Sequence, residues 1–230
     1  EDGALDWDNK DTRAALADFA TKDLLSATIS TYFLNDMFGS MVGPLWTLAG
    51  IPDRNAALEN TFERMWDGNR GFAAPRHVSN GFLGLRFSPQ SDSRLPVDLL
   101  PHLLLNGTDV GSGKRLITST IRWSAQGALF PDSGDLIQLV GRDVRMATAV
   151  TNSARFPFIS PAGRFVSKDP SGTTAYQIID GGYFENYGAR TAWELARAIE
   201  DLNAQDPSLE VVPIVVVVSN DLDADQPPRA

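Results

Sequence analysis

The residues from Val211 to Val218 form an almost unbroken run of β-branched side chains near the end of the 230-residue chain. A strand covered on both faces has this continuous apolar pattern, whereas a strand with one solvated face alternates apolar and polar residues. An amphipathic stretch typical of a helix, Ala189–Leu202, precedes the run, and a short apolar strand, Ala175–Ile179, precedes that helix. This order predicts a right-handed βαβ unit, and therefore an α/β fold with a mostly parallel central sheet and helices on both faces.

Further segments of regular pattern occupy the first two thirds of the chain, between stretches rich in glycine, proline and serine. We expect two strands around a turn at 111–113, a third short strand, and two helices. The predicted strands are 102–106, Arg115–Trp123 and Leu136–Val140, and the predicted helices are 52–66 and Asp143–Ser153. No internal repeat or linker divides the sequence, so we expect one domain over 1–230, with an apolar helical region at 1–66 and a core α/β segment at 100–219.

Composition excludes several classes of function. The chain has no cysteine, which rules out disulfides, thiolate nucleophiles and zinc or iron–sulfur sites built on cysteine. Its net charge is −9 and no stretch concentrates Lys and Arg, which argues against nucleic-acid partners and against electrostatic attraction to anionic lipid. Only two histidines occur, His77 and His102, and neither lies in a metal-binding motif. We therefore expect no metal and no cofactor.

The most apolar region is Leu24–Ile51, whose single charge is Asp36. It is not a transmembrane helix, because polar residues, glycines and Pro44 interrupt every window of about 18–20 residues. One interpretation, which we favour, is a pair of short buried helices. The alternative is an apolar surface that contacts lipid, since a run so rich in Phe, Leu, Met and Trp exceeds what a small core readily buries.

Asp180 is the best candidate for chemistry, because it ends a predicted buried strand and is followed by Gly181 and Gly182. Ligand sites in open parallel sheets lie outside the carboxyl ends of strands, and glycines permit close backbone approach there. A carboxylate held at such a position can act as a general base. The alternative is a simple turn, in which aspartate is a favoured residue. The pattern by itself does not separate the two.

Three blocks in a fixed order give the sequence a family resemblance. The first, Leu103–Arg115, contains a strand and a glycine-rich turn; the second, Ala147–Pro161, contains a helix and a proline segment; the third, Tyr176–Gly188, contains Asp-Gly-Gly. Together they resemble the patatin-like phospholipase family and cover about residues 100–219. The region 24–65 is a looser match to the segment that precedes these blocks in large bacterial members.

The resemblance implies a patatin-like three-layer fold and a lipid acyl hydrolase with a serine–aspartate dyad. In that family the aspartate takes the serine proton directly, without a histidine, and backbone amides of a glycine-rich loop form the oxyanion hole. By motif match, Asp180 takes the aspartate role, with Gly181 and Gly182 beside it and Asn186 bracing the loop. The implied substrate is a lipid or another acyl ester, and the implied chemistry needs no cofactor.

The sequence departs from the family pattern at the nucleophile. No serine has glycine two places before and two places after it: Ser40 has Phe38 and Val42 there, and Ser112 lies between glycines at one-residue spacing. The glycine-rich oxyanion loop is absent too, and in the family both motifs precede the blocks present here. We therefore expect the domain to be incomplete on its N-terminal side and its missing part to be a partner of this chain.

Three functional alternatives remain open from the sequence. The first is the hydrolase, of which this chain supplies the aspartate; the second is a non-catalytic patatin-fold module that binds lipid or a partner protein. An acyltransferase using the same dyad is the third. Membrane contact through Leu24–Ile51 is a further hypothesis, and the compartment stays open between membrane-associated and cytoplasmic.

Overall fold

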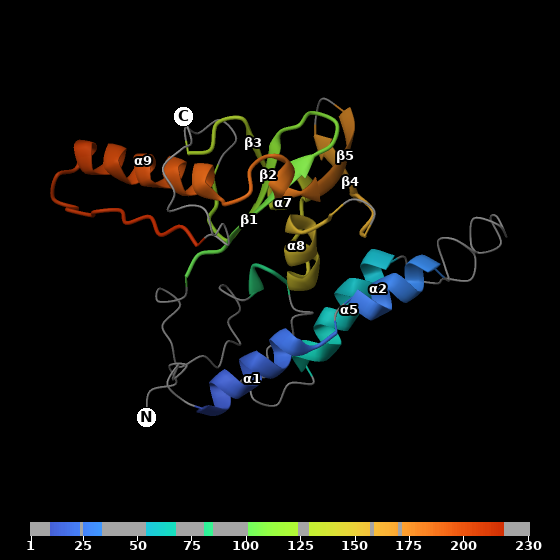
Figure 1. Ribbon diagram of the computed structural model, residues 1–230. Helices are drawn as coiled ribbons and strands as arrows, with labels where there is room; N and C mark the ends of the chain where they lie inside the picture. Colours follow the sequence, from blue (N-terminus) through green and yellow to red (C-terminus); the bar gives the residue numbers. More distant parts are fainter. Residues whose placement is uncertain are drawn as a thin grey trace, which may run out of the picture.

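The computed structural model describes residues 10–23, 25–33, 54–67, 81–84, 101–123, 129–156, 159–169 and 172–218. Within these ranges the chain has a mixed α/β fold with a curled five-stranded sheet, against which some helices pack while others extend from it or lie apart from it (Figure 1). The strands are β1 (Leu104–Asp109), β2 (Arg115–Ser119), β3 (Ser133–Asp135), β4 (Gly163–Asp169) and β5 (Gly172–Asp180). The helices are α1 (Lys10–Thr21), α2 (Leu25–Thr31), α5 (Arg54–Asp67), α7 (Leu136–Val140), α8 (Met146–Ser153), α9 (Ala189–Gln205) and the 3₁₀ turn η3 (Gly181–Tyr183).

The sheet has the strand order β3-β2-β1-β5-β4 and is mostly antiparallel. Only the β2–β3 pair is parallel; β1–β2, β1–β5 and β4–β5 are antiparallel. The α/β class is therefore confirmed, but the mostly parallel pairing is not seen among the described strands. A tight turn between β1 and β2 accounts for part of the difference, because strands joined by a short turn pair antiparallel. Asp109 shapes this predicted turn by accepting hydrogen bonds from the Ser112 N–H and hydroxyl, at 2.9 and 2.6 Å.

Leu136–Val140 is a helix, α7, and its prediction as a strand is wrong. Asp135 caps its start by accepting the Gln138 N–H at 3.1 Å, and Gly141 ends it in the left-handed conformation, with φ of 71°. Aspartate before an apolar run and glycine after it are helix signals, which the run's length of five residues had obscured. Leu136 packs with Leu116 and Ile178 in the buried core of the sheet.

Burial of Asp135 gives a test of this cap. Desolvation raises the pKa of the Asp135 carboxyl above the ordinary value, because burial disfavours the charged form. The folded protein is therefore stabilised by the protonated carboxyl at low pH, and this stabilisation is lost as pH rises through the folded-state pKa. Asparagine keeps the cap acceptor without the charge. We expect the free energy of unfolding of Asp135→Asn, measured in urea, to equal or exceed that of the wild type at pH 7. The difference between the two free energies should shrink toward pH 3.

The control for this prediction is Asp135→Ala, which removes the cap acceptor and is expected to cost about 0.5–2 kcal/mol at any pH. A wild type that gains stability over Asp135→Asn as pH rises from 3 to 7 would show that the buried charge is favourable, contrary to the desolvation argument.

The predicted helices in the core segment are confirmed with small changes of boundary. The helix expected at 143–153 is α8, which starts at Met146; the helix expected at 189–202 is α9, which continues to Gln205. The helix expected at 52–66 is α5. The strand expected at 102–106 is β1, which continues to Asp109. The strand expected at Arg115–Trp123 is β2, which already ends at Ser119.

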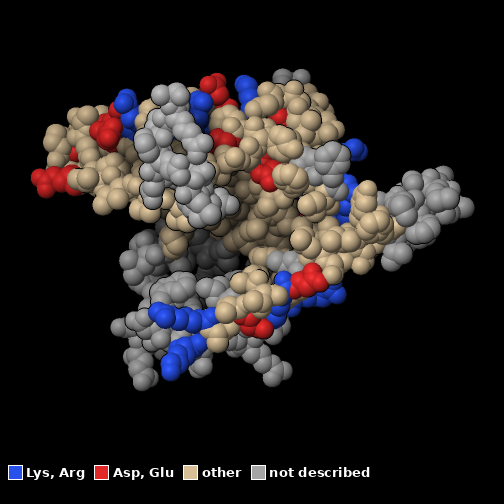
Figure 2. Space-filling view, viewed as in Figure 1, with Lys and Arg blue, Asp and Glu red and all other residues tan. Residues whose placement is uncertain are grey.

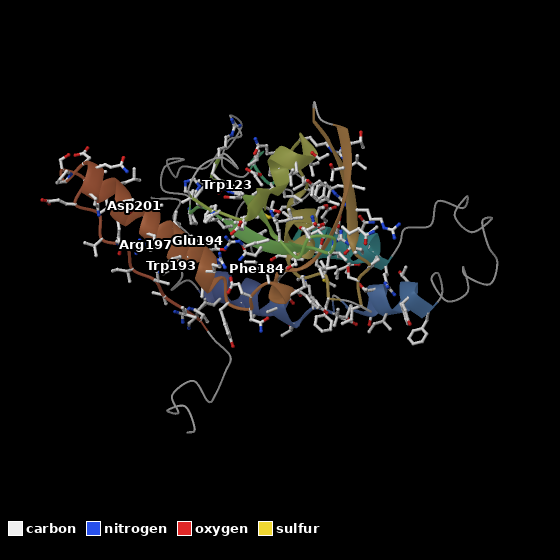
Figure 3. The ribbon with its side chains drawn as sticks, turned by 90° about the horizontal axis from the view of Figure 1, so that it is seen from above. Trp123, Phe184, Trp193, Glu194, Arg197 and Asp201 are labelled. Carbon is white, nitrogen blue, oxygen red and sulfur yellow. The ribbon has the colours of Figure 1, made fainter. Side chains whose placement is uncertain are left out.

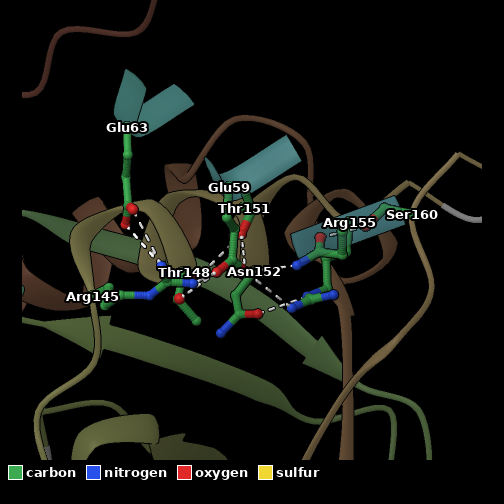
Figure 4. Close-up of polar contacts among 9 residues, drawn as sticks. Glu59, Glu63, Arg145, Thr148, Thr151, Asn152, Arg155 and Ser160 are labelled. Carbon is green, nitrogen blue, oxygen red and sulfur yellow. Dashed lines mark hydrogen bonds and ion pairs between the residues drawn. The ribbon is translucent and has the colours of Figure 1, made fainter. Parts of the chain in front are cut away.

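Helix α5 is joined to α8 by a buried carboxylate, Glu59, which is 4% exposed (Figure 4). Its two oxygens accept hydrogen bonds from Arg145 at 2.5 Å, Thr148 at 2.7 Å and Thr151 at 3.1 Å. Arg155 lies 3.7 Å away as a second cation. A buried charge with this many partners is satisfied, so the network fixes how α5 packs against α8.

The apolar region at Leu24–Ile51 is described only in part. Helix α2 falls within it, but its large side chains face solvent: Leu25, Ile29, Tyr32 and Phe33, the last two directly after the helix, are between 43% and 52% exposed. For α2, the expectation of a buried helix is therefore wrong; residues 34–51 lie outside the described residues. None of the described helices has the length and hydropathy needed to span a bilayer.

Val211–Val218 is extended but belongs to no sheet, so the prediction of a buried strand is wrong for this structure. In a simple βαβ unit it would lie near β5, yet β1 and β4 already occupy both sides of β5. Helix α9 starts against β2 and extends away from the sheet, and the segment after it runs back along the helix (Figure 1). The strand pattern is present, but the described residues offer it no neighbouring strand.

Candidate functional site

Asp180 is the last residue of β5, where its Cα pairs with Gly107 of the central strand β1. Two hydrogen bonds to its main chain fix its position: the Thr108 hydroxyl donates to its carbonyl at 2.9 Å, and its N–H donates to the Arg155 carbonyl at 3.1 Å. Its side chain caps η3, with Oδ1 accepting the Gly182 N–H at 2.6 Å. The carboxylate is thus held at a strand end, partly exposed, as the Asp-Gly-Gly pattern predicts.

The two glycines allow the chain to turn directly beneath β1. A Cβ at Gly181 would lie 2.4 Å from the carbonyl oxygen of Asn106, a contact that backbone atoms cannot relieve. A Cβ at Gly182 would lie 2.7 Å from the side-chain oxygen of Asn186 and 3.0 Å from Asp180 Oδ1. The first glycine is therefore required by main-chain packing, whereas the second keeps space beside the carboxylate.

Gly181→Ala is accordingly expected to destabilise the protein by about 2–3 kcal/mol or more, because overpacking against backbone forces the strand end apart. Urea unfolding would measure the loss. The matched control is Gly84→Ala, whose Cβ would meet nothing within 4 Å and which should change stability by less than about 0.5 kcal/mol. Equal stability of the two variants would contradict the packing assigned to Gly181.

The loop after Asp180 is braced chiefly by Glu185, which the sequence analysis did not single out. One Glu185 oxygen accepts the N–H groups of Tyr187 at 3.3 Å and Ala189 at 3.1 Å, and the other accepts a long hydrogen bond, 3.4 Å, from Asn106 Nδ2. Asn186, the predicted brace, is exposed, and its side-chain oxygen lies beside Gly182. A carboxylate before a helix start is an N-terminal signal that could have identified Glu185.

Arg115 anchors α9 behind this loop, although nothing in the sequence pattern identified it. Its side chain is 0% exposed, donates to Ser133 at 2.9 Å and Thr191 at 2.7 Å, and forms an ion pair with Glu194, which is 5% exposed. Phe184 covers the guanidinium, with 5.1 Å from Cζ to the ring centroid. In Figure 3, Glu194 lies toward the sheet and Trp193 on the outer side of α9.

The serines and histidine near the site are engaged elsewhere. Ser153 donates its hydroxyl to the Asn106 carbonyl at 2.6 Å, and Ser112 is held by Asp109 in the β1–β2 turn. His102 contacts the Thr120 hydroxyl at 3.0 Å, whereas His77 lies outside the described residues. The described part of the chain therefore presents an oriented carboxylate without a nucleophile bonded to it.

A cavity of about 490 Å³ opens between α5 and the segment before β4. Glu59, Arg155 and Arg164 line it, but Asp180 does not; Arg155 contacts the candidate site through its carbonyl, which accepts the Asp180 N–H. Charged groups are interspersed over the face in Figure 2, without a continuous basic surface on the described residues. Among those residues, no group of three or more carboxylate or imidazole side chains is arranged to hold a metal ion.

The site that these observations define is a turn carboxylate at the end of β5, supported by hydrogen bonds from the Thr108 hydroxyl and to the Arg155 carbonyl and by the buried Arg115–Glu194 pair. Comparisons with protein-family models, with curated proteins and with solved structures found no match to this chain.

Proposed function

We propose that this chain supplies the aspartate of a serine–aspartate dyad in a patatin-like lipid acyl hydrolase, whose three-layer fold and serine elbow are completed by polypeptide outside these 230 residues. The observation that carries the proposal is the anchoring of Asp180. Its Oδ1 is bound by the Gly182 N–H, while among the described residues no donor is bonded to Oδ2. A carboxylate oriented by one oxygen keeps the other for a proton.

In the proposed reaction, the serine Oγ attacks the acyl carbonyl carbon while its proton passes to Asp180 Oδ2. The tetrahedral intermediate collapses, the ester C–O bond breaks, and the proton is transferred to the departing alcohol. Water then attacks the acyl-serine, Asp180 takes its proton and returns one to the serine, and the free acid leaves. The glycine-rich loop would come from the polypeptide outside these 230 residues. Its backbone amides would stabilise the oxyanion during both acylation and deacylation of the serine.

The rival function is a non-catalytic patatin-like module that binds lipid or a partner protein. The observation favouring it is that the sequence contains no Gly-x-Ser-x-Gly motif. The coding sequence upstream of Glu1 separates the two. The hydrolase requires a glycine-rich loop and a Gly-x-Ser-x-Gly elbow there or in a companion gene, and their absence from both would leave the non-catalytic module. An acyltransferase would differ from the hydrolase only in products, when an acceptor alcohol is supplied.

Membrane contact through the 24–51 region is proposed on the exposure of α2. Leu25, Ile29 and Phe33, each about half exposed, give the described part of this region an apolar surface that could enter the interface of a bilayer. We expect the chain to co-sediment with phosphatidylcholine liposomes and to be released by Ile29→Lys with Phe33→Lys. No sedimentation with either neutral or anionic vesicles would contradict the proposal.

A further inference from the structure

The cavity between the start of α5 and the segment that leads into β4 has the size of a small-molecule site. Its volume of about 490 Å³ lies within the range of cavities that bind such ligands. Its polar lining residues are Asn55, Glu59, Arg155 and Arg164, and the others are alanine, glycine and proline. Because no large apolar side chain lines it, the cavity is suited to a polar ligand that forms hydrogen bonds with the wall, and not to an acyl chain.

The wall of the cavity is built around Arg155, which is 7% exposed. Its Nε donates to the Asn152 side-chain oxygen at 2.7 Å, a contact visible in Figure 4, and its Nη1 donates to the Pro161 carbonyl at 2.8 Å. The glycine at position 163 leaves space for this guanidinium, since a Cβ there would lie 2.9 Å from Nε and 3.0 Å from Cζ. The cation is thus fixed in the wall before a ligand arrives, which reduces the entropy cost of binding.

Glu59 is the carboxylate of this wall, and its hydrogen-bonding capacity is already used. Its Oε1 accepts hydrogen bonds from Asn55 at 2.6 Å and Thr151 at 3.1 Å. Its Oε2 accepts hydrogen bonds from Arg145 at 2.5 Å and Thr148 at 2.7 Å. A carboxylate has about four acceptor positions. Glu59 therefore has no acceptor position left for a donor on a ligand.

The donors of the cavity, in contrast, are only partly used. Asn55 is 4% exposed, its Oδ1 accepts the Ser160 hydroxyl at 2.7 Å, and only one of the two Nδ2 hydrogens is bonded to a described residue, Glu59. Arg164 is exposed, and its guanidinium forms no hydrogen bond or ion pair with any described residue. An arginine that no contact holds can turn over a ligand and bind two of its oxygens at once. The cavity thus offers chiefly donors, which calls for a ligand rich in acceptors.

The charges around the cavity favour an anion. Glu59 and Glu63 are balanced by Arg145, which lies 2.5 and 3.1 Å from them, and by Arg155, which lies 3.7 Å from Glu59. Arg164 adds a positive charge that these carboxylates do not neutralise. The whole chain has a net charge of −9, which disfavours adsorption of anions elsewhere on its surface. The attraction for an anion is therefore local to this cavity.

We propose that this cavity binds a small, water-soluble organic oxyanion, whose phosphate or carboxylate group takes hydrogen bonds from Arg164 and Asn55 beside the wall formed by Arg155. The cavity is much larger than the few water volumes that a phosphate group occupies, so it has room for the organic part of such a ligand. The inference stands independently of the proposed hydrolase, because it uses neither Asp180 nor a serine.

Ribose 5-phosphate and citrate are the probes for a direct test, one a phosphate monoester and the other a carboxylate. Each is titrated into the 230-residue chain by calorimetry in about 0.1 M sodium chloride, which screens weak surface attraction. We expect saturable binding of at least one probe with a Kd below about 1 mM, and at least tenfold weaker binding of uncharged ribose. The tighter of the two probes identifies the group that the cavity holds.

Two outcomes of the titrations would overturn the proposal. Binding of both probes only above about 10 mM would show no site of useful affinity. Inorganic phosphate bound as tightly as the better probe would show an adventitious ion only, since the organic part of the ligand would then contribute nothing.

Arg164→Gln supplies the matching test on the protein, because the side chain is exposed and its replacement should leave the fold intact, as circular dichroism would verify. We expect about tenfold or more weaker binding of the better probe, since the variant loses a charged, two-pronged donor. The control Arg197→Gln changes an exposed arginine on α9 and should bind like the wild type. Unchanged binding in Arg164→Gln, or an equal loss in Arg197→Gln, would contradict the proposed site.

A second pair of variants tests the cavity without removing any of its donors. Ala162→Glu places a carboxylate in the lining next to Arg164 and should abolish binding of the anionic probes, because like charges repel there. Ala162→Gln adds a side chain of the same size without the charge and should weaken binding by a smaller factor. Equal affinities of these two variants would show that charge in the cavity does not control binding and would overturn the proposal.

Discussion

Arg115→Met is expected to lower the free energy of unfolding by about 3–5 kcal/mol, enough to unfold a marginally stable domain. The guanidinium is fully buried, and its removal leaves Glu194 as a buried carboxylate whose remaining ionic partner is Arg190, at 3.0 Å and about half exposed. The change also removes donors to Ser133 and Thr191, so β2, β3 and α9 lose their common contact. Urea unfolding followed by tryptophan fluorescence would measure the loss.

Two further variants distinguish a lost ion pair from lost volume. Arg115→Met combined with Glu194→Met removes both charges, and it should be more stable than Arg115→Met alone because no unpaired charge stays buried. Arg197→Met changes an exposed arginine on the same helix and should cost less than about 1 kcal/mol. A double variant no more stable than Arg115→Met would contradict the assignment of the effect to the stranded Glu194.

Asp180→Asn is expected to reduce ester turnover by about 10³-fold or more in a protein that carries the serine elbow, because loss of the proton acceptor from a catalytic pair costs on this scale. Asparagine can still accept the Gly182 N–H, so the cap of η3 and the fold should survive. The expected signature is a fall in kcat with little change in the melting temperature.

The matched control for this prediction is Asp132→Asn, which replaces an exposed aspartate in the left-handed conformation, with φ of 62°, that asparagine also tolerates. It should leave turnover unchanged. If Asp180→Asn also kept wild-type turnover, Asp180 would be only a turn residue, which is the alternative that the Asp-Gly-Gly pattern left open.

Local signals predicted the backbone around Asp180 well. The strand end at Asp180 and the turn at Gly181 follow from a short apolar run and two glycines, both of which act within a few residues. The helix α7 could also have been predicted, since Asp135 and Gly141 are ordinary cap residues around it. Its misassignment came from giving the apolar run more weight than its flanking residues.

Contacts between distant residues could not be predicted in this way. Arg115 and Glu194 are 79 positions apart, and Glu59 meets Thr151 across 92 positions, so no periodicity relates them. Val211–Val218 illustrates a different limit. Its pattern indicates that both faces are suited to burial, but it does not identify the polypeptide that covers them. The described residues do not cover them.

If this chain contributes one half of a hydrolase site, as we propose, joining it to the half that carries the serine should produce activity. The measurement is the initial rate of p-nitrophenyl butyrate hydrolysis by the 230-residue chain, first alone and then joined to the polypeptide that carries the Gly-x-Ser-x-Gly elbow. We expect no rate above buffer for the chain alone and turnover for the joined protein, abolished by Asp180→Asn. Hydrolysis by the chain alone, or a joined protein that is inactive or indifferent to Asp180→Asn, would contradict it.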